Sequence, residues 1–146
     1  MKTLRISDSS LCAPSLSFRE KVEIGKLLDA ARVDVIETPP IANEKIDSLL
    51  LHSLAMVVKN GVLCCPAGNT EEEVDRAFSA LSGAAKKRLS ASVPVSAVAM
   101  EYACHKKPQQ VLETIAQLVA RCKTHTQDVE FAAQDATRAE PDFLIQ

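Results

Sequence analysis

The sequence predicts an α/β fold built from parallel βαβ units. Two observations support this: short β-branched runs alternate with amphipathic helical patterns, and the connections between them are short. Such alternation favours strands that lie parallel in one sheet and are joined by right-handed helical crossovers. With 146 residues, 47% of them hydrophobic, the chain is long enough to bury a core of its own.

The first βα unit and the second strand are predicted from residues 4 to 40. An extended run at 4–6 precedes a polar turn at 7–10, and apolar residues recur at helical spacing over 18–31. The β-branched run 33–38 predicts a second strand. Pro39-Pro40 follows directly and stops it.

Capping residues mark the second helix, which leads into a third strand. Asn43 is suited to cap its first turn, and we expect the helix to end at Asn60-Gly61 with glycine as the C-cap. The run 62–65 predicts the third strand. Its cysteines, Cys64 and Cys65, project to opposite faces of an extended chain, and we interpret them as packing residues rather than metal ligands.

A capping box predicts the start of the third helix. Thr70 and Glu73 have the required spacing, and apolar residues continue on one face to Ala85. The acidic run 71–73 suits the positive end of the helix dipole, and the basic run 86–88 suits its negative end.

The rest of the chain predicts two further strands and two further helices. Apolar and small polar residues alternate over 89–95, which predicts a fourth strand. Pro108 is placed to open a helix that continues to Cys122, and 129–131 predicts a fifth strand. Residues 141–146 resemble another helix start.

The spacing of the predicted strands indicates which α/β fold this is. They begin near residues 4, 33, 61, 88 and 128, about 30 residues apart except for the last, and a (β/α)8 barrel of about 250 residues uses about 31 per unit. We therefore predict a partial (β/α)8 TIM barrel over 1–146: about five parallel strands, four to five helices, and an incomplete fifth βα unit. The alternative is a doubly wound sheet. No glycine-rich phosphate loop follows any strand, which disfavours a dinucleotide or P-loop site.

Composition excludes several classes of partner. Seventeen basic and 19 acidic side chains give a net charge of −2, without the basic excess typical of proteins that bind nucleic acid or anionic membranes. Four Phe, one Tyr and no Trp leave few platforms for stacking bases. No run approaches a membrane span of about 20 apolar residues, and the start lacks a signal-peptide apolar region, so we expect a cytoplasmic protein.

The five cysteines predict reduced thiols. Their number is odd and no C-x-x-C spacing occurs, which favours a reducing compartment over a disulfide framework. A thiol-based enzyme using Cys12 is the weakest functional hypothesis, because no neighbour in sequence would lower the pKa of that thiol.

Four segments carry a family resemblance. They are 6–11 (I-S-D-S-S-L), 18–37, 100–102 (M-E-Y) and 129–144 (V-E-F-A-A-Q-D-A-T-R-A-E-P-D-F-L). In order, they resemble the D-T-T-L-R-D-G opening, the first helix with the second strand, the H-x-E-Y/H-K segment and the fifth-strand motif of the acyl-CoA-condensing family that contains 2-isopropylmalate synthase, homocitrate synthase and citramalate synthase. The resemblance implies an N-terminal TIM barrel, of which this chain covers the first five strands.

The resemblance also implies a chemistry that can be checked residue by residue. The family condenses acetyl-CoA with a 2-keto acid, using a divalent metal, a base and an arginine that stabilises the oxyanion. Its arginine aligns with Cys12 and its metal-binding aspartate with Ala13, and neither residue can take that role. The fifth-strand glutamate is Gln134 here, and the histidine falls at Ala99. The family's metal-binding H-x-H pair lies on a later strand, and none of this chain's three histidines forms such a pair. We predict no metal and no cofactor for this chain.

The candidate site residues are those expected at the barrel mouth: Asp8, Cys12, Glu37, Glu101, Gln134, Asp135 and Arg138. Each has a purely structural alternative. Asp8 suits a turn or cap. Glu37 and Glu130 lie on apolar strands and suit either a mouth position or pairing with a barrel cation. The three fifth-strand residues suit either ligand contact or loop-shaping salt bridges. For His105-Lys106-Lys107, a solvated loop is the default and anion binding the second interpretation.

Two functional hypotheses remain. In the first, the protein is a degenerate relative that binds a partner or a small carboxylate without condensing acetyl-CoA. In the second, it is the N-terminal part of a longer acyltransferase with altered chemistry. An open sheet with two edges and an aliphatic inner face predicts self-association, or completion by a missing C-terminal half.

Overall fold

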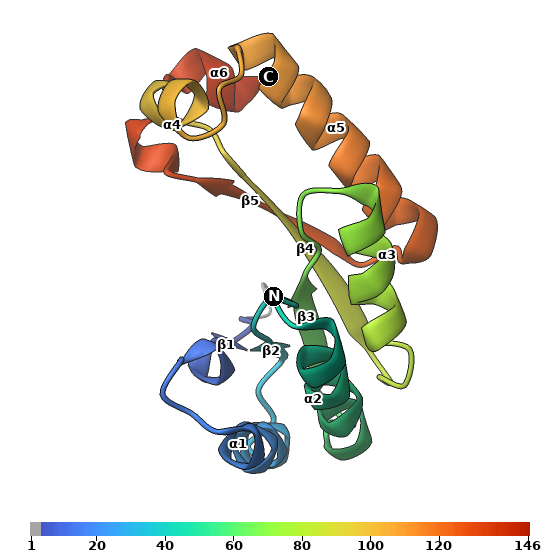
Figure 1. The fold of residues 1–146 in the computed structure, drawn as a ribbon. Helices are drawn as coiled ribbons and strands as arrows, with labels where there is room; N and C mark the ends of the chain where they lie inside the picture. Colours follow the sequence, from blue (N-terminus) through green and yellow to red (C-terminus); the bar gives the residue numbers. More distant parts are fainter. Residues whose placement is uncertain (1–3) are drawn as a thin grey trace.

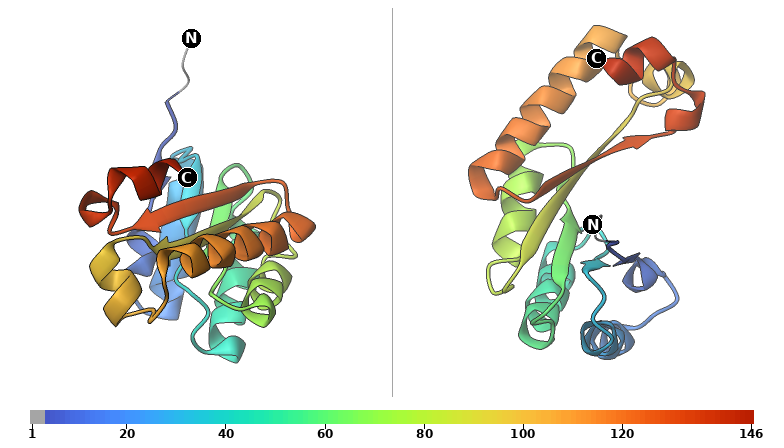
Figure 2. Two further views of the ribbon diagram at one scale, coloured as in Figure 1. Left: turned by 90° about the horizontal axis from the view of Figure 1, so that it is seen from above. Right: turned by 180° about the vertical axis from the view of Figure 1, so that it is seen from behind.

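The computed structural model describes residues 4–146, and it shows a curled sheet of five parallel strands with helices along its outer side (Figure 1). The strands are ordered β1-β2-β3-β4-β5. A doubly wound sheet would reverse that order at a switch point, so the predicted partial barrel is confirmed. Figure 2 shows the same curl from two other sides.

The elements follow one another along the chain. They are β1 (Ser7–Asp8), the 3-10 turn η1 (Ser10–Cys12), α1 (Phe18–Ala30), β2 (Val35–Glu37), α2 (Glu44–Val57), β3 (Val62–Pro66), α3 (Glu71–Ala80), β4 (Lys87–Pro94), α4 (Ala97–Tyr102), α5 (Pro108–His125), β5 (Val129–Gln134), the 3-10 turn η2 (Ala136–Arg138) and α6 (Pro141–Ile145). The described residues thus hold six α-helices, against four to five predicted.

The hydrophobic core lies between the outer face of the sheet and the helices. Alternate β4 residues Leu89, Ala91 and Val93 are buried there, as their period of two predicted. Cys65 of β3 belongs to the same core, whereas Cys64 has the opposite orientation. The core is almost wholly aliphatic.

The inner face of the sheet carries polar and charged side chains. Ser7 Oγ donates to Glu37 Oε1 at 2.6 Å, and Arg88 Nη1 lies 2.8 Å from Glu130 Oε2. Cys64 is the register partner of both Glu37 and Arg88. The expectation of an aliphatic inner face is therefore wrong. The large aliphatic residues alternate toward the helices, and these polar residues take the positions between them.

A buried carboxylate joins α1 to the turn between α2 and β3. Asp29, only 6% exposed, accepts hydrogen bonds from the backbone N–H groups of Asn60 (2.7 Å) and Gly61 (2.9 Å). Its other oxygen accepts from Asn60 Nδ2 at 2.9 Å. A Cβ on Gly61 would lie 2.9 Å from the carbonyl oxygen of Val33, so the turn has no room for a larger residue.

This junction overturns the predicted glycine C-cap of α2. The helix ends at Val57, and its C-cap Val58 is extended and 2% exposed. Burial of that side chain in the core turns the chain out of the helix. The N–H groups of Asn60 and Gly61 then bind Asp29 rather than helical carbonyls.

Two other predicted boundaries are wrong. The first strand is β1, not 4–6, because the N–H of Ile6 donates to the Asp34 carboxylate at 2.8 Å. The predicted turn at 7–10 therefore contains β1. Helix α3 ends at Ala80 rather than Ala85, and a short turn follows it.

The basic run after α3 suits the helix end only in part. Lys87 Nζ donates to the carbonyl of Ser82, just beyond the helix. Arg88 instead belongs to β4 and binds carboxylates of the neighbouring strand.

Capping residues are where sequence and structure agree most closely. Asn43 Oδ1 accepts from the N–H of Ile46, and Thr70 and Glu73 form the predicted capping box. Ser17 and Glu20 form a second capping box at α1.

Over residues 4–146, no helix combines the length and the apolar character needed to cross a membrane.

The Asp29 junction predicts an acid-sensitive contribution to stability. Burial by itself would raise the pKa of Asp29, but hydrogen bonds from Gly61, Asn60 and Lys59 outweigh it and the pKa is lowered. A carboxyl whose pKa is lower in the folded state stabilises fully above its unfolded pKa of about 3.9, and this stabilisation is lost as pH falls through the folded pKa. We expect Asp29→Asn to reduce the free energy of unfolding by about 2 kcal/mol at pH 7, measured by urea denaturation.

The difference between wild type and Asp29→Asn should shrink as pH falls below about 4. Glu23→Gln, on the exposed side of α1, is the matched control and should leave stability nearly unchanged. A difference between wild type and Asp29→Asn that stays constant from pH 7 to pH 3 would contradict this assignment.

Candidate functional site

The carboxyl ends of all five strands lie at one end of the sheet, because the strands are parallel. Barrel enzymes place their sites at this end. It carries Asp8 at the end of β1, Glu37 at the end of β2 and Gln134 at the end of β5. Most of the residues predicted for the mouth are therefore at the mouth, but they form separate groups.

The first group lies over β1 and β2. Asp8 Oδ1 accepts from the N–H of Ser10 at 2.8 Å, which starts the turn η1. Leu11 is fully buried and anchors that turn, so Cys12 is held with its Sγ 3.9 Å from the Glu37 carbonyl oxygen. Asp8 thus acts as a turn residue here, and Cys12 lies beside the backbone of β2.

The Cys12 thiol is electrostatically disfavoured as a thiolate. Partial burial raises its pKa, the Glu37 carboxylate raises it further, Lys21 lowers it and Asp8 raises it. The thiol is therefore neutral near pH 7, and a neutral thiol is a poor nucleophile and a poor metal ligand. This agrees with the low rank of Cys12 among the functional hypotheses.

The second group closes the end of β5. Asp135 adopts a left-handed backbone conformation (φ 60°), and Arg138 Nε donates to its Oδ1 at 2.7 Å. The buried hydroxyl of Ser96 donates to its other oxygen. The bond from Arg138, followed by that from Ser96, lowers the pKa of Asp135. The described contacts of Asp135 and Arg138 are those of a salt bridge that shapes the loop.

Sequence reasoning missed Ser96. Its hydroxyl also accepts from the N–H of Ala99 and caps α4, a helix that the sequence analysis did not predict. A serine directly before a run that contains the helix formers Ala97, Ala99 and Met100 was the available signal.

A cavity of about 390 Å³ lies at the carboxyl ends of β4 and β5. The polar residues of its lining are Gln134, Ser92, Asn69, Thr114 and Lys106. Lys106 Nζ donates to Thr114 Oγ1 at 2.9 Å, which holds a positive charge at this cavity. The arrangement offers one cation and several neutral hydrogen-bonding groups to a small polar ligand.

Glu101 does not join the other candidates. It is exposed on α4 and lines a second cavity, of about 500 Å³, with His105 and Lys107. Lys106 lines both cavities. Glu101 and Gln134 therefore line different cavities, which share Lys106.

Arg88, on the inner face, pairs with two carboxylates of the neighbouring chain segment. Arg88 binds Asp128 at 2.8 Å as well as Glu130, and these carboxylates, Asp128 first, raise its pKa. Glu130 therefore pairs with a barrel cation, one of the two roles considered for it. Beside them, burial and then Glu130 raise the pKa of Cys64 to about 12, and burial raises that of Cys65 to about 11. Both thiols are buried and protonated, as packing residues are.

Within residues 4–146, no group of three or more His, Cys, Asp or Glu side chains is placed to hold a metal ion.

Comparison with known proteins adds to this geometry. The family model described as HMGL-like matches residues 5–146. The 2-isopropylmalate synthase of Pyrococcus abyssi is 38% identical over 133 residues, which cover 90% of this chain and 27% of that protein. The 2-isopropylmalate synthases of Rhodopseudomonas palustris (strain BisB18) and Bradyrhizobium sp. (strain ORS 278) are each 36% identical over 146 residues, covering 99% of this chain and 27% of theirs. The chain spans about a quarter of the length of these relatives.

The environment of Cys12 predicts slow alkylation. At pH 7.5 we expect the Cys12 peptide to react with iodoacetamide more slowly than a free cysteine peptide, measured by mass spectrometry over time. Glu37→Gln should speed the reaction, because it removes the carboxylate that helps to raise the pKa of Cys12.

Glu130→Gln is the matched control. It removes a carboxylate that acts on Cys64 instead, so the rate at Cys12 should not change. Faster alkylation of Cys12 than of the free peptide would contradict the neutral thiol.

Proposed function

Because this chain belongs to the HMGL-like family, we propose that it is a 2-isopropylmalate synthase-like protein whose residues 5–146 match the family but do not condense an acyl-CoA with a 2-keto acid. The family resemblance implies the reaction, and the side chains present at the mouth are the reason for proposing that this chain does not carry it out.

The observation that carries the proposal is the pair Cys12 and Ala13, in the turn directly after β1. The resemblance implies an arginine and a metal-binding aspartate at these positions. A neutral thiol cannot replace a guanidinium, and the methyl group of alanine cannot bind a cation. Asp8, the carboxylate nearest in sequence, already accepts the N–H of Ser10. The residues after β1 therefore do not fit the family's divalent metal.

Gln134 supports the same proposal from the other side of the mouth. The resemblance implies a glutamate at this position, and an amide cannot accept a proton as a carboxylate does. Gln134 instead lines the cavity of about 390 Å³.

We propose that this cavity binds a small carboxylate. The Lys106 ammonium supplies the positive charge, and Thr114, whose hydroxyl donates to the Gln110 carbonyl, helps to position it. Gln134 and Asn69 add neutral donors and acceptors. One cation among neutral hydrogen-bonding groups suits a single carboxylate.

The length of the relatives favours a second candidate function. This chain covers 27% of each of them, so the same residues would also suit the N-terminal part of a longer acyltransferase with altered chemistry. Reading the gene beyond the codon for Gln146 separates the two. An H-x-H pair on a further predicted strand supports the longer protein, and a stop codon there contradicts it.

The proposal predicts no condensation by this chain. Acetyl-CoA with 2-ketoisovalerate or 2-ketoglutarate, plus Mg²⁺, Mn²⁺ or Zn²⁺, should release no CoA thiol above background in a thiol-reagent assay. The 2-isopropylmalate synthase of Pyrococcus abyssi, assayed alongside, is the positive control. Turnover above background would overturn the proposal that this chain does not condense an acyl-CoA with a 2-keto acid.

We also propose that the chain self-associates. Within the described residues, β1 pairs only with β2 and β5 only with β4, so each has one free edge. With a polar inner face, these edges are the main support for association. A second copy offers matching edges, so that two half-barrels can complete each other.

Light scattering at tens of micromolar should then give a mass that is a multiple of the 15.8 kDa chain. The carbonyls of Asp128 and Gln134 face β4, so by alternation the N–H of Ala133 faces the free edge. Ala133→Pro should therefore lower the mass toward the monomer while preserving the β4 pairing. A clean wild-type monomer would count against self-association.

A further inference from the structure

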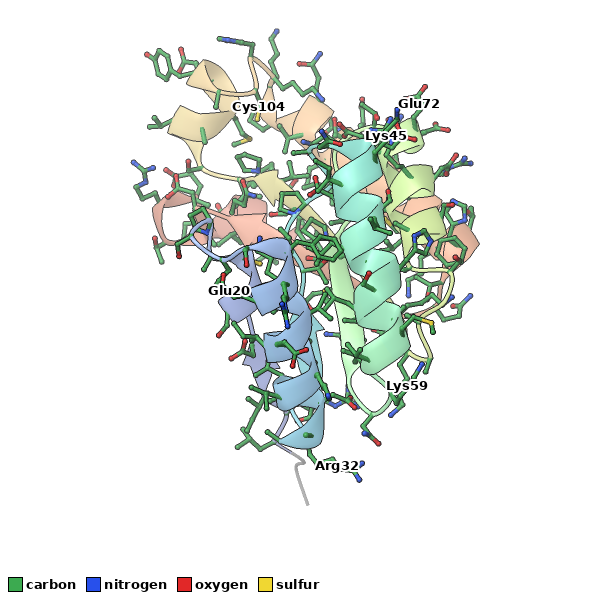
Figure 3. The ribbon with its side chains drawn as sticks, turned by 60° about the horizontal axis from the view of Figure 1, so that its bottom comes forward. Glu20, Arg32, Lys45, Lys59, Glu72 and Cys104 are labelled. Atoms are coloured by element: carbon green, nitrogen blue, oxygen red, sulfur yellow. The ribbon has the colours of Figure 1, made fainter. Side chains whose placement is uncertain are left out.

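The end of the sheet opposite the mouth holds a cavity of about 470 Å³. Its charged lining comes from the segments that lead into the strands: Arg5, Arg32, Asp34, Lys86 and Asp128. In Figure 3, Arg32 lies at the far end of α1 from Glu20. This cavity is thus separate from the mouth and plays no part in the function proposed above.

Two of the cations are held on one residue. Arg32 Nη1 donates to the side-chain oxygen of Asn60 at 2.6 Å, and Lys86 Nζ donates to its backbone carbonyl at 2.8 Å. Asn60 is itself fixed, because Asp29 accepts both its N–H and its side-chain amide. Two positive charges from different loops are therefore anchored side by side, and Arg5 adds a third to the same lining.

Each of the two carboxylates in the lining accepts hydrogen bonds from a donor other than Arg5, Arg32 or Lys86. Both oxygens of Asp128 accept from Arg88, at 2.8 and 3.4 Å, and Asp34 accepts the N–H of Ile6. Over residues 4–146, none of Arg5, Arg32 and Lys86 forms an ion pair within 4.0 Å. The three cations of the lining outnumber its two carboxylates by one.

The backbone at Arg32 gives an independent indication. α1 ends in a Schellman motif, in which the N–H of Val33 donates to the Leu28 carbonyl and that of Arg32 to the Asp29 carbonyl. Arg32 occupies the left-handed position of the motif (φ 63°), where glycine is most favourable. An arginine there costs conformational free energy, and strained residues of this kind concentrate at ligand-binding sites.

We propose that this cavity binds the phosphate group of a small anion, either inorganic phosphate or a phosphate monoester. The guanidinium groups of Arg32 and Arg5 offer planar pairs of N–H donors that match the geometry of phosphate oxygens. Lys86 adds a compact positive charge. Asn60, already engaged by both, positions the two cations.

The test is titration calorimetry on the 146-residue chain with inorganic phosphate and with glycerol 3-phosphate, against sodium chloride of equal ionic strength. We expect saturable binding of at least one phosphate probe and none of chloride. Saturation by glycerol 3-phosphate alone would identify the ligand as a monoester, and saturation by both would identify the phosphate group itself as sufficient. Binding of neither would overturn the proposal.

Arg32→Gly should weaken phosphate binding about tenfold, because it removes a charged donor. Glycine is favoured at this backbone position, so the variant should fold. The midpoint of its thermal unfolding checks this. His105→Gly is the matched control, since His105 is also left-handed (φ 52°) but lines another cavity. It should bind phosphate as wild type does.

Lys86→Met keeps the test decisive if Arg32→Gly does not fold. It should also weaken binding about tenfold. Wild-type affinity in the folded variants would place the phosphate elsewhere and overturn the proposal. None of these measurements involves an acyl-CoA, so their outcome is independent of the condensation assay.

Discussion

Five strands pair in parallel and in chain order, and this pairing places every other feature of the molecule. A parallel strand can be followed by the next only if the chain crosses back over the sheet, which requires a helix or a long loop between them. The carboxyl ends of all strands, with Asp8, Glu37 and Gln134, are thereby gathered at one end. The loops that carry Arg32, Asn60 and Lys86 are gathered at the other.

The two faces of the curled sheet differ in polarity, one aliphatic and the other polar and charged. Successive side chains of a strand alternate, so Leu89 and Ala91 enter the core while Arg88 remains on the inner face. There it meets Asp128 and Glu130, and the inner face acquires paired charge instead of aliphatic surface. Packing against the helices stabilises the outer face of the strands, whereas the inner face presents polar and charged side chains.

The family's scaffold and the family's reaction depend on different sets of residues. Family membership is carried by residues 5–146 as a whole, while the family's reaction depends on a few side chains at the mouth. The turn after β1 presents Cys12 and Ala13, and the environment of Cys12 keeps its thiol neutral. Sequence reasoning located this turn and the group at Gln134. The helix that carries Glu101, α4, was not predicted, and Glu101 lines a different cavity from Gln134.

The sequence by itself determined the fold class, the strand order and the starts of all the described helices except α4. Hydrophobic period and caps such as Thr70 with Glu73 depend on residues within one turn of each other. Only the tertiary structure decided where α2 ends, since Asp29 binds a turn 31 residues away. It alone decided the partners of Arg88, which lie 40 and 42 residues away. Sequence patterns reflect interactions between residues that are close along the chain. The partners of Asp29 and Arg88 depend instead on which distant residues the folded chain places beside them.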